Sequence, residues 1–300
     1  MKHHVLSVLF VILLLPLSAS AAMRVFSCEP EWASLVTELA GDRVEVFTAT
    51  TAQQDPHYIQ ARPSLIARMR RADLVVCTGA ELEVGWLPVL MARSGNPKVK
   101  PGTDGYFEAA GFVPMLGVPQ RLDRAEGDIH ARGNPHIQLD PHNIERVAAA
   151  LGERLAKLDP ENAADYSTRL DDFTRRWQSA MQRWETLAEP LRGMPVVVHH
   201  ESWTYLNNWL GLNQIGTLEP KPGVPPSSSH LAELLVTLKA TPARAVIRAP
   251  FEESRASEWL SKQAGLVMLE LPYTVGGNAQ STDLFGLFDS SIALLLGAQS

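Results

Sequence analysis

Three of the nine histidines lie where the sequence pattern changes from a strand or a loop to a helix. His57 and His136 each follow a proline in a loop, and His200 ends an apolar run over 196–198. Neutral imidazole is a common ligand of Zn²⁺, Cu²⁺ and Ni²⁺. In α/β proteins ligands bind outside the carboxyl ends of strands, so these positions permit a transition-metal site. Each histidine taken alone is more often a surface or core residue than a ligand, and their spacing does not show that they converge.

The elements that must position these histidines alternate between short apolar strands and amphipathic helices. Such alternation predicts an α/β fold of two lobes, each with a mainly parallel sheet flanked by helices. We predict strands over 24–28, 44–48, 73–77, 195–198, 245–247 and 267–271, with 112–118 as a candidate for one more, and helices over 31–40, 63–71, 143–158, 160–187, 203–209, 231–239, 253–264 and 284–296.

The helix that follows Pro160 carries large apolar residues at steps of three and four along its whole length. This spacing gives one continuous apolar face, which favours packing across the protein's own lobes over a coiled-coil partner. At about 1.5 Å per residue the helix is roughly 40 Å long, enough to join two lobes. We therefore divide the mature chain into an N-terminal lobe over 22–142, connecting helices with a long linking helix over 143–190, and a C-terminal lobe over 191–300.

The first residues predict export. A short basic start is followed by an apolar run over 5–17 and by small residues at 19–21, which is typical of a cleaved secretory signal peptide over 1–21. Later segments lack the length of uninterrupted apolar sequence that a membrane span needs, so we expect a soluble periplasmic protein. The formal charge of -6 and the lack of a basic run argue against nucleic acid as a partner.

Cys28 and Cys77 are the two cysteines, and each closes an apolar run that reads as a strand. If the two strands are neighbours in a parallel sheet, the thiols come within bridging range in an oxidising compartment. The alternative is two small buried apolar side chains. The pair does not have the close spacing of a thiolate zinc site.

Four segments carry a specific set of motifs in a fixed order. They are Asp55-Pro56-His57 with Pro63-Ser64; Ala72 to Val76 with Gly79, Leu82-Glu83 and Trp86; Asn134-Pro135-His136 with Leu139-Asp140-Pro141; and 198–205 with 210–212. With these motifs the chain resembles, from Val25 to its C-terminus, the zinc and manganese substrate-binding proteins of bacterial metal-uptake ABC transporters.

The resemblance implies His57, His136 and His200 as metal ligands. The neighbour His199 is the other candidate for the third ligand. We prefer His200 because it stands five residues before Tyr205, as in the family pattern. Side chains alternate along a strand, so only one of the two adjacent histidines should reach the cleft.

The chain departs from the family pattern at the fourth ligand, which in the family is usually an Asp just after the last strand. The segment 270–277 contains no Asp, and Asp283 is the nearest substitute. Asp283 can equally serve as the N-cap of the last helix, and both roles stay open. Gln138 also replaces a position that is commonly aromatic in the family.

A long His- and Asp-rich loop, present in many zinc receptors, is nearly absent here. Glu126, Asp128 and His130 remain in that region, and we interpret them as part of a solvated loop. His142 and His230 stand near the starts of predicted helices, and we assign them no metal role.

The resemblance implies a receptor that binds a metal ion between its lobes and delivers it to an inner-membrane ABC permease. Three imidazoles favour Zn²⁺ over the harder Mn²⁺, which prefers oxygen donors. We expect a monomer without enzymatic activity. Two alternatives remain: a zinc hydrolase with an open fourth position and Glu201 as base, and a metal-binding adhesin or buffer. The sequence contains neither a His-Glu-x-x-His nor a Gly-x-Ser-x-Gly motif.

Overall fold

The computed structural model describes residues 22–121 and 127–299, which form two parallel four-stranded sheets. The sheets have the orders β2-β1-β3-β4 and β6-β5-β7-β8, so both lobes have the same strand arrangement. The first sheet contains β1 (Met23–Ser27), β2 (Val44–Thr48), β3 (Leu74–Cys77) and β4 (Tyr106–Glu108); the second contains β5 (Pro195–Val198), β6 (Asn213–Thr217), β7 (Ala245–Arg248) and β8 (Val267–Glu270). The predicted signal peptide over 1–21 lies outside the described residues.

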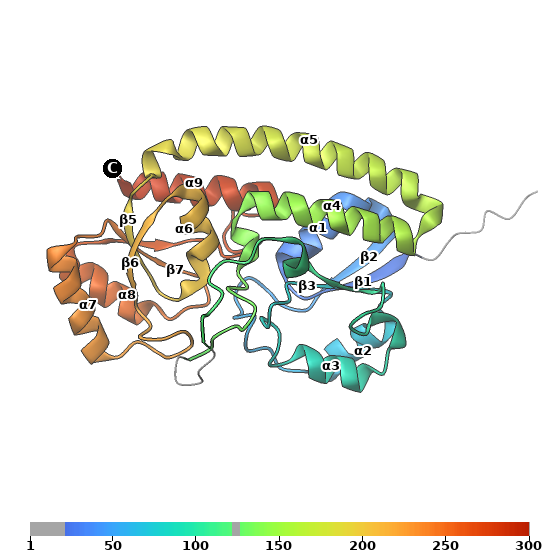
Figure 1. Ribbon diagram of the computed structural model, residues 1–300, viewed down its shortest axis with the longest axis horizontal. Helices are drawn as coiled ribbons and strands as arrows, with labels where there is room; N and C mark the ends of the chain where they lie inside the picture. Colours follow the sequence, from blue (N-terminus) through green and yellow to red (C-terminus); the bar gives the residue numbers. More distant parts are fainter. Residues whose placement is uncertain (1–21, 122–126, 300) are drawn as a thin grey trace, which may run out of the picture.

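Helices cover both faces of each sheet (Figure 1). They are α1 (Pro30–Ala40), α2 (Pro63–Arg71), α3 (Leu87–Ser94), α4 (Pro141–Leu158), α5 (Ala163–Ala188), α6 (Thr204–Leu210), α7 (Ser228–Ala240), α8 (Ser254–Ala264) and α9 (Leu284–Gln299). None of the helices found in the two described ranges is both long and apolar enough to cross a membrane. The α/β architecture of two lobes with parallel sheets is therefore confirmed.

One hydrophobic core extends through both lobes. It combines apolar side chains of β1, β3, β5 and β7 with the inner faces of α1, α4, α5 and α9. Two smaller clusters lie on the opposite faces of the sheets, under α2 and α3 in the first lobe and under α7 and α8 in the second. Because a single core joins the lobes, a wide opening between them would expose apolar surface to water.

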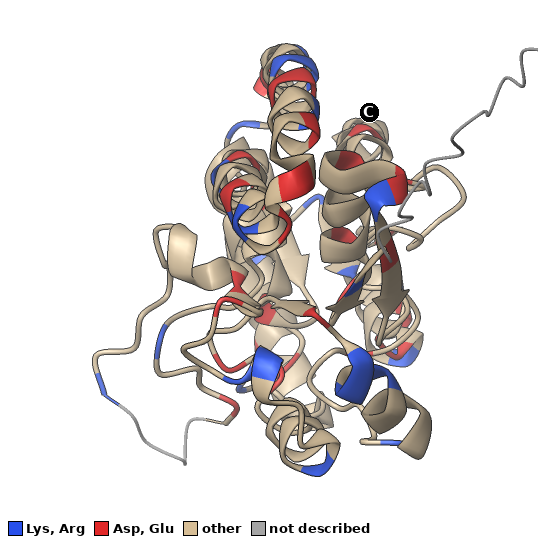
Figure 2. Ribbon diagram, turned by 90° about the vertical axis from the view of Figure 1, so that its right-hand side faces the viewer, with Lys and Arg blue, Asp and Glu red and all other residues tan. Residues whose placement is uncertain are grey.

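The helix α5 passes over both lobes, and α9 lies beneath it (Figure 1). Its buried face carries Trp177, whose ring lies 4.9 Å from Phe285 and 5.6 Å from Phe288 of α9. The predicted apolar face is thus confirmed, except that Leu187 at its end is half exposed. The helix carries both acidic and basic residues (Figure 2). Asp172 forms ion pairs with Arg175 and Arg176, about one turn away.

The predicted strand over 112–118 is wrong. The edge of the first sheet is formed instead by β4, which pairs with β3 through Val75 and Tyr106. The ring of Phe112 stacks on Phe107 of β4 at 4.8 Å, so its apolar character serves packing and not strand pairing. The edge strands β4 and β6 and the short α3 were not predicted, since edge strands that are brief or rich in polar residues give little alternating pattern.

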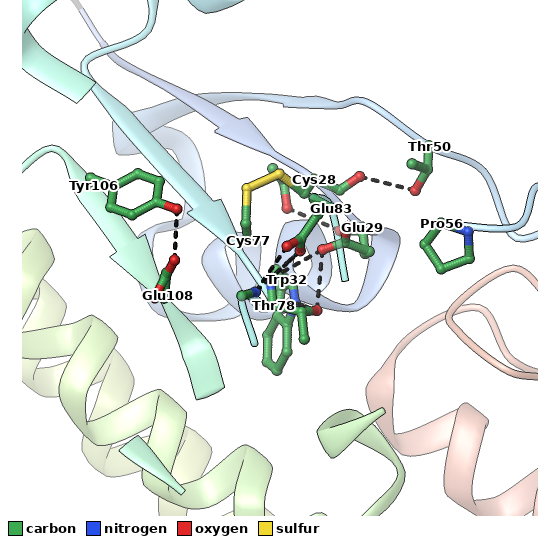
Figure 3. The surroundings of a disulfide bond; sticks show 12 residues. Cys28, Glu29, Trp32, Thr50, Pro56, Cys77, Thr78, Glu83, Tyr106 and Glu108 are labelled. Carbon is green, nitrogen blue, oxygen red and sulfur yellow. Dashed lines mark hydrogen bonds between the residues drawn. A yellow bond between two sulfur atoms is a disulfide. The ribbon is translucent and has the colours of Figure 1, made fainter. Parts of the chain in front are cut away.

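Cys28 follows β1 directly and Cys77 ends β3. These strands are parallel neighbours, so the two Cα atoms lie 4.8 Å apart and the residues form a disulfide (Figure 3). Both side chains are fully buried. Of the two alternatives left by the sequence, pairing is the one that the structure shows.

Two buried glutamates lie beside the disulfide (Figure 3). Glu29 and Glu83 both accept from the backbone N–H of Thr78, at 3.3 and 2.8 Å. Burial raises the pKa of Glu29 well above its ordinary value, and the neighbouring carboxylates of Glu83 and Glu31 add to this. Burial also raises the pKa of Glu83 to about 7. These carboxyl groups therefore hold protons at pH values where exposed glutamates are ionised.

Replacing both cysteines, as in a Cys28→Ala, Cys77→Ala variant, should lower the free energy of unfolding by about 4 kcal/mol. The reason is that the disulfide joins residues 49 positions apart and so restricts the unfolded chain. Urea unfolding followed by circular dichroism measures the change, with wild-type protein reduced by dithiothreitol as a second form lacking the bond. Equal stability of oxidised and reduced wild type would contradict the prediction.

A Glu83→Gln variant should lose less stability than wild type as the pH rises from 5 to 7.5. The folded-state pKa of Glu83 is raised, so its contribution is full below about pH 4.5 and is lost as the pH rises through about 7. That loss is on the order of 3 kcal/mol, and glutamine cannot show it. Urea unfolding across this pH range tests the effect, with Glu161→Gln at an exposed position as control. Parallel curves for Glu83→Gln and wild type would refute it.

Candidate metal centre

Three imidazoles from distant parts of the chain meet at one place. Ligand nitrogens of His57, His136 and His200 all lie within 4.8 Å of one another. The ring centroids are 5.3 Å apart for His57 and His136, 5.5 Å for His136 and His200, and 5.7 Å for His57 and His200. Nitrogens that share a tetrahedral Zn²⁺ stand about 3.3 Å apart, so a small inward shift would let one ion bind all three.

The Nδ1 atom of each imidazole is held by a neighbouring polar group. The pairs are His57 with Asp55 Oδ1 at 2.8 Å, His136 with the Tyr273 hydroxyl at 2.7 Å, and His200 with Glu219 Oε2 at 2.7 Å. The Nε2 atoms of His57 and His136 are buried and have no hydrogen-bond partner among the described residues. Partners of this kind fix the ring orientation and leave the second nitrogen free to bind a metal.

The site lies where strands end. His200 follows β5, Glu219 follows β6 and Tyr273 follows β8, while His57 lies in the loop between β2 and α2. All of these segments leave the carboxyl edges of the two sheets, which is where α/β folds bind ligands. His136 precedes α4, and its hydrogen bond to Tyr273 reaches the second lobe.

The loops that carry His57 and His136 are anchored by residues of the sequence motifs. Trp86 Nε1 donates to the carbonyl of Pro56, next to His57, at 2.8 Å. The Tyr205 hydroxyl donates to the carbonyl of Asn134, two residues before His136, at 3.0 Å. The Asn134 amide also donates to the Glu201 carbonyl at 2.8 Å. The His136 loop is thereby attached to the second lobe at two points.

Burial and charge shift the pKa values of His136 and His200 in opposite directions. Burial lowers the pKa of His136 well below its ordinary value, and the nearby His57 and His200 lower it further. Burial would also lower the pKa of His200, but the hydrogen bond and charge of Glu219 outweigh it and raise that pKa. Asp55 and Glu219 place two carboxylates against the rings of His57 and His200, where they could offset the charge of a divalent cation.

The structure does not bring the other two sequence candidates into this group. His199 is buried and lines a neighbouring pocket with Phe251 and Trp259. Asp283 Oδ1 accepts from the backbone N–H of Gly286 at 2.7 Å, so it caps the start of α9. Asp283 also lines a hollow beside α1. A further close group of Cys28, Cys77 and Glu83 offers no thiolate, because its sulfurs form the disulfide.

His130 is a residue of this region that the sequence reasoning missed. Its ring centroid lies 5.4 Å from that of His57, and it lines one pocket together with His136 and His200. Burial lowers its pKa to about 4, with smaller effects of His57 and His200. The interpretation as a solvated loop fits Asp128, which is exposed, but not His130. Glu126 lies outside the described residues. The only signal in the sequence was a histidine between two ligand motifs in a chain that lacks the usual fourth ligand.

His142 repeats the local geometry of His57 away from the site. In both Asp-Pro-His segments the histidine N–H and Nδ1 approach the Asp side chain, here Asp140 at 2.9 Å for each. His142 is more exposed, and its Nε2 lies 3.3 Å from Glu185. His230 Nε2 is hydrogen-bonded to the Thr217 carbonyl at 2.9 Å.

Comparisons with known proteins show the family of this chain. A family model described as zinc-uptake complex component A, periplasmic, matches residues 25–295. The high-affinity zinc uptake system protein ZnuA of Yersinia pestis is 27% identical over 216 residues, which cover 65% of this chain and 65% of the relative. The zinc-binding lipoprotein AdcA of Streptococcus pneumoniae is 24% identical, and the match covers 76% of this chain but 45% of the relative. The chain therefore spans less than two thirds of the length of both relatives.

A manganese relative and two solved structures extend the comparison. The manganese ABC transporter substrate-binding lipoprotein PsaA of Streptococcus pneumoniae is 23% identical over 264 residues, covering 86% of this chain and 81% of the relative. A crystal structure of ZnuA superposes with a TM-score of 0.73 at 24% identity, over 92% of this chain and 100% of that chain. The Mn-bound periplasmic metal binding protein from Candidatus Liberibacter asiaticus superposes with a TM-score of 0.75 at 17% identity, over 93% and 100%. The structural likeness shows the shared fold, and the sequence match shows the family: this chain belongs to the zinc-uptake complex component A family of periplasmic substrate-binding proteins.

Proposed function

We propose that this protein captures Zn²⁺ between its lobes with His57, His136 and His200 and delivers it to an ABC permease. The observation that carries the proposal is the convergence of three imidazoles, each oriented by a partner on Nδ1. The named zinc uptake and ABC transporter relatives support the delivery step. The protein acts as a periplasmic monomer that docks on the permease of an inner-membrane importer.

The chemistry of the donors favours Zn²⁺ over Mn²⁺. Imidazole nitrogen suits zinc, whereas manganese prefers carboxylate, carbonyl and water oxygens. The carboxylates of Asp55 and Glu219 are hydrogen-bonded to the imidazoles. In this arrangement they orient the nitrogen donors and are not themselves donors to the ion. One relative is named for zinc and another for manganese. Titration with both metals is therefore needed to decide which ion this protein prefers.

The same arrangement supports a receptor over a hydrolase. A hydrolytic zinc site needs an open position for water and a general base beside it. Here the carboxylates in contact with the imidazoles are engaged in orienting them. The core shared by both lobes limits wide hinge motion, so release would use small shifts of the lobes and rearrangement of the ligand loops.

A His57→Ala, His200→Ala variant should bind Zn²⁺ on the order of 1000-fold more weakly than wild type, because it retains one of three converging imidazoles. Competition titration of metal-free protein against a chelator of known zinc affinity measures the change. The matched control is His142→Ala, His230→Ala, which removes two histidines outside the group. Zinc affinity that stays at the wild-type level in the first variant would end the proposal.

A Glu219→Gln variant should bind Zn²⁺ about 10- to 100-fold more weakly, because the charge that orients His200 is removed. Glu252→Gln is the control: burial raises the pKa of Glu252 to about 8, so at pH 7 glutamine replaces a carboxyl group that is already neutral. Chelator competition at pH 7 compares the two variants. Equal losses in both would show that Glu219 has no special role.

A further inference from the structure

Three imidazoles leave one tetrahedral position of a bound zinc ion to be filled. Asp283, the nearest substitute for the Asp that the family pattern places after the last strand, is not available for it. Asp283 caps α9 and lines a hollow beside α1. The fourth donor must therefore be a water molecule or another side chain close to the three rings.

His130 lies beside one of these rings, that of His57, and lines a pocket with the other two residues. Its ring lies as close to His57 as the rings of His136 and His200 do, at 5.4 Å against 5.3 and 5.7 Å between centroids. The Nε2 atom of His130 is buried, yet within the described parts of the chain it has no hydrogen-bond partner. A buried polar atom left unpaired is costly, by about 1–3 kcal/mol, and a metal ion would satisfy it.

His130 belongs to a short segment over 127–133, which we call the strap. The strap is attached to both lobes: the Tyr58 hydroxyl donates to Asp128 Oδ2 at 2.5 Å, and Asp128 N–H donates to the Pro222 carbonyl at 2.9 Å. In addition Ala131 N–H donates to Glu81 Oε2 at 2.6 Å. These bonds hold His130 over the pocket that it lines with His136 and His200.

The strap turns sharply at its end next to the second ligand motif. Gly133 has φ +108°, and a Cβ there would lie 2.7 Å from the Leu116 carbonyl oxygen. Glycine is therefore required for this path of the backbone, which carries the chain from His130 back to the His136 loop.

The charge around the site is compatible with a neutral fourth donor. Asp55 and Glu219 already place two carboxylates against the rings of His57 and His200. Together they can offset the two positive charges of Zn²⁺, so no carboxylate is needed in direct contact with the ion. A fourth imidazole would complete a nitrogen-only site, which disfavours Mn²⁺ further.

We propose that His130 is the fourth protein ligand of the bound metal, brought into place by the strap. His130 is not one of the three residues whose ligand nitrogens lie within 4.8 Å of one another, so as a ligand its ring would have to lie closer to His136 and His200 than it does here. This inference rests on the proposed function, namely zinc binding by His57, His136 and His200.

X-ray absorption at the zinc edge of the zinc-loaded full chain tests the proposal, because the scattering of imidazole rings reports how many histidines bind the ion. We expect four imidazoles in wild type and three plus one oxygen donor in His130→Ala. Chelator competition should show zinc affinity on the order of 100-fold lower in His130→Ala. His142→Ala should leave both readouts unchanged.

A Tyr58→Phe variant separates ligation from attachment of the strap, since it removes the hydrogen bond to Asp128 and keeps the His130 ring. It should retain four imidazoles. Two results would overturn the role of His130 while leaving the three-histidine receptor intact. One is a wild-type zinc site with three imidazoles and an oxygen donor, and the other is wild-type zinc affinity in His130→Ala. Wild-type affinity in His57→Ala, His200→Ala would instead overturn the proposed function itself.

Discussion

A metal site of imidazoles requires several nitrogen lone pairs to remain unpaired in a buried place. Such atoms are costly in a folded protein, by about 1–3 kcal/mol each, unless a ligand satisfies them. Here the Nε2 atoms of His57, His130 and His136 are all in this condition within the described residues. The hydrogen bonds and loop contacts around the site must therefore offset the free-energy cost of keeping these atoms unpaired.

The residues that hold the imidazoles are connected by further hydrogen bonds to the buried interior of the protein. His136 is hydrogen-bonded to the Tyr273 hydroxyl. Thr274, which follows Tyr273 in the chain, donates a hydrogen bond to the buried Glu31 of α1 at 2.5 Å. Burial raises the pKa of Glu31 to about 7, as it does for Glu83 beside the disulfide. The bond from Thr274 to Glu31 joins the last loop of the second lobe to the first lobe, one residue along the chain from the partner of His136.

The lobes themselves restrict how the site can open. Both sheets have the same strand order, and segments that leave their carboxyl edges bring His57 and His200 together with the hydrogen-bond partners Glu219 and Tyr273. A core shared through α5 and α9 lies behind the cleft, and the Tyr205 and Asn134 contacts connect its two sides. With the lobes held in this way, the loops and the strap are the parts whose movement costs least, since they bury less apolar surface.

The alternation of apolar runs and amphipathic segments was sufficient to predict two parallel α/β lobes and a long helix, because these features depend on local periodicity. It also placed His57, His136 and His200 where a strand or a loop changes to a helix, and the family motifs singled them out. Local pattern could not show that Asp283 caps α9 or that Cys28 and Cys77 pair. It also could not show that His130 turns inward, nor that β4 takes the sheet edge in place of 112–118. Those outcomes depend on contacts between residues distant along the chain, which are decided only when the two lobes pack around their common core.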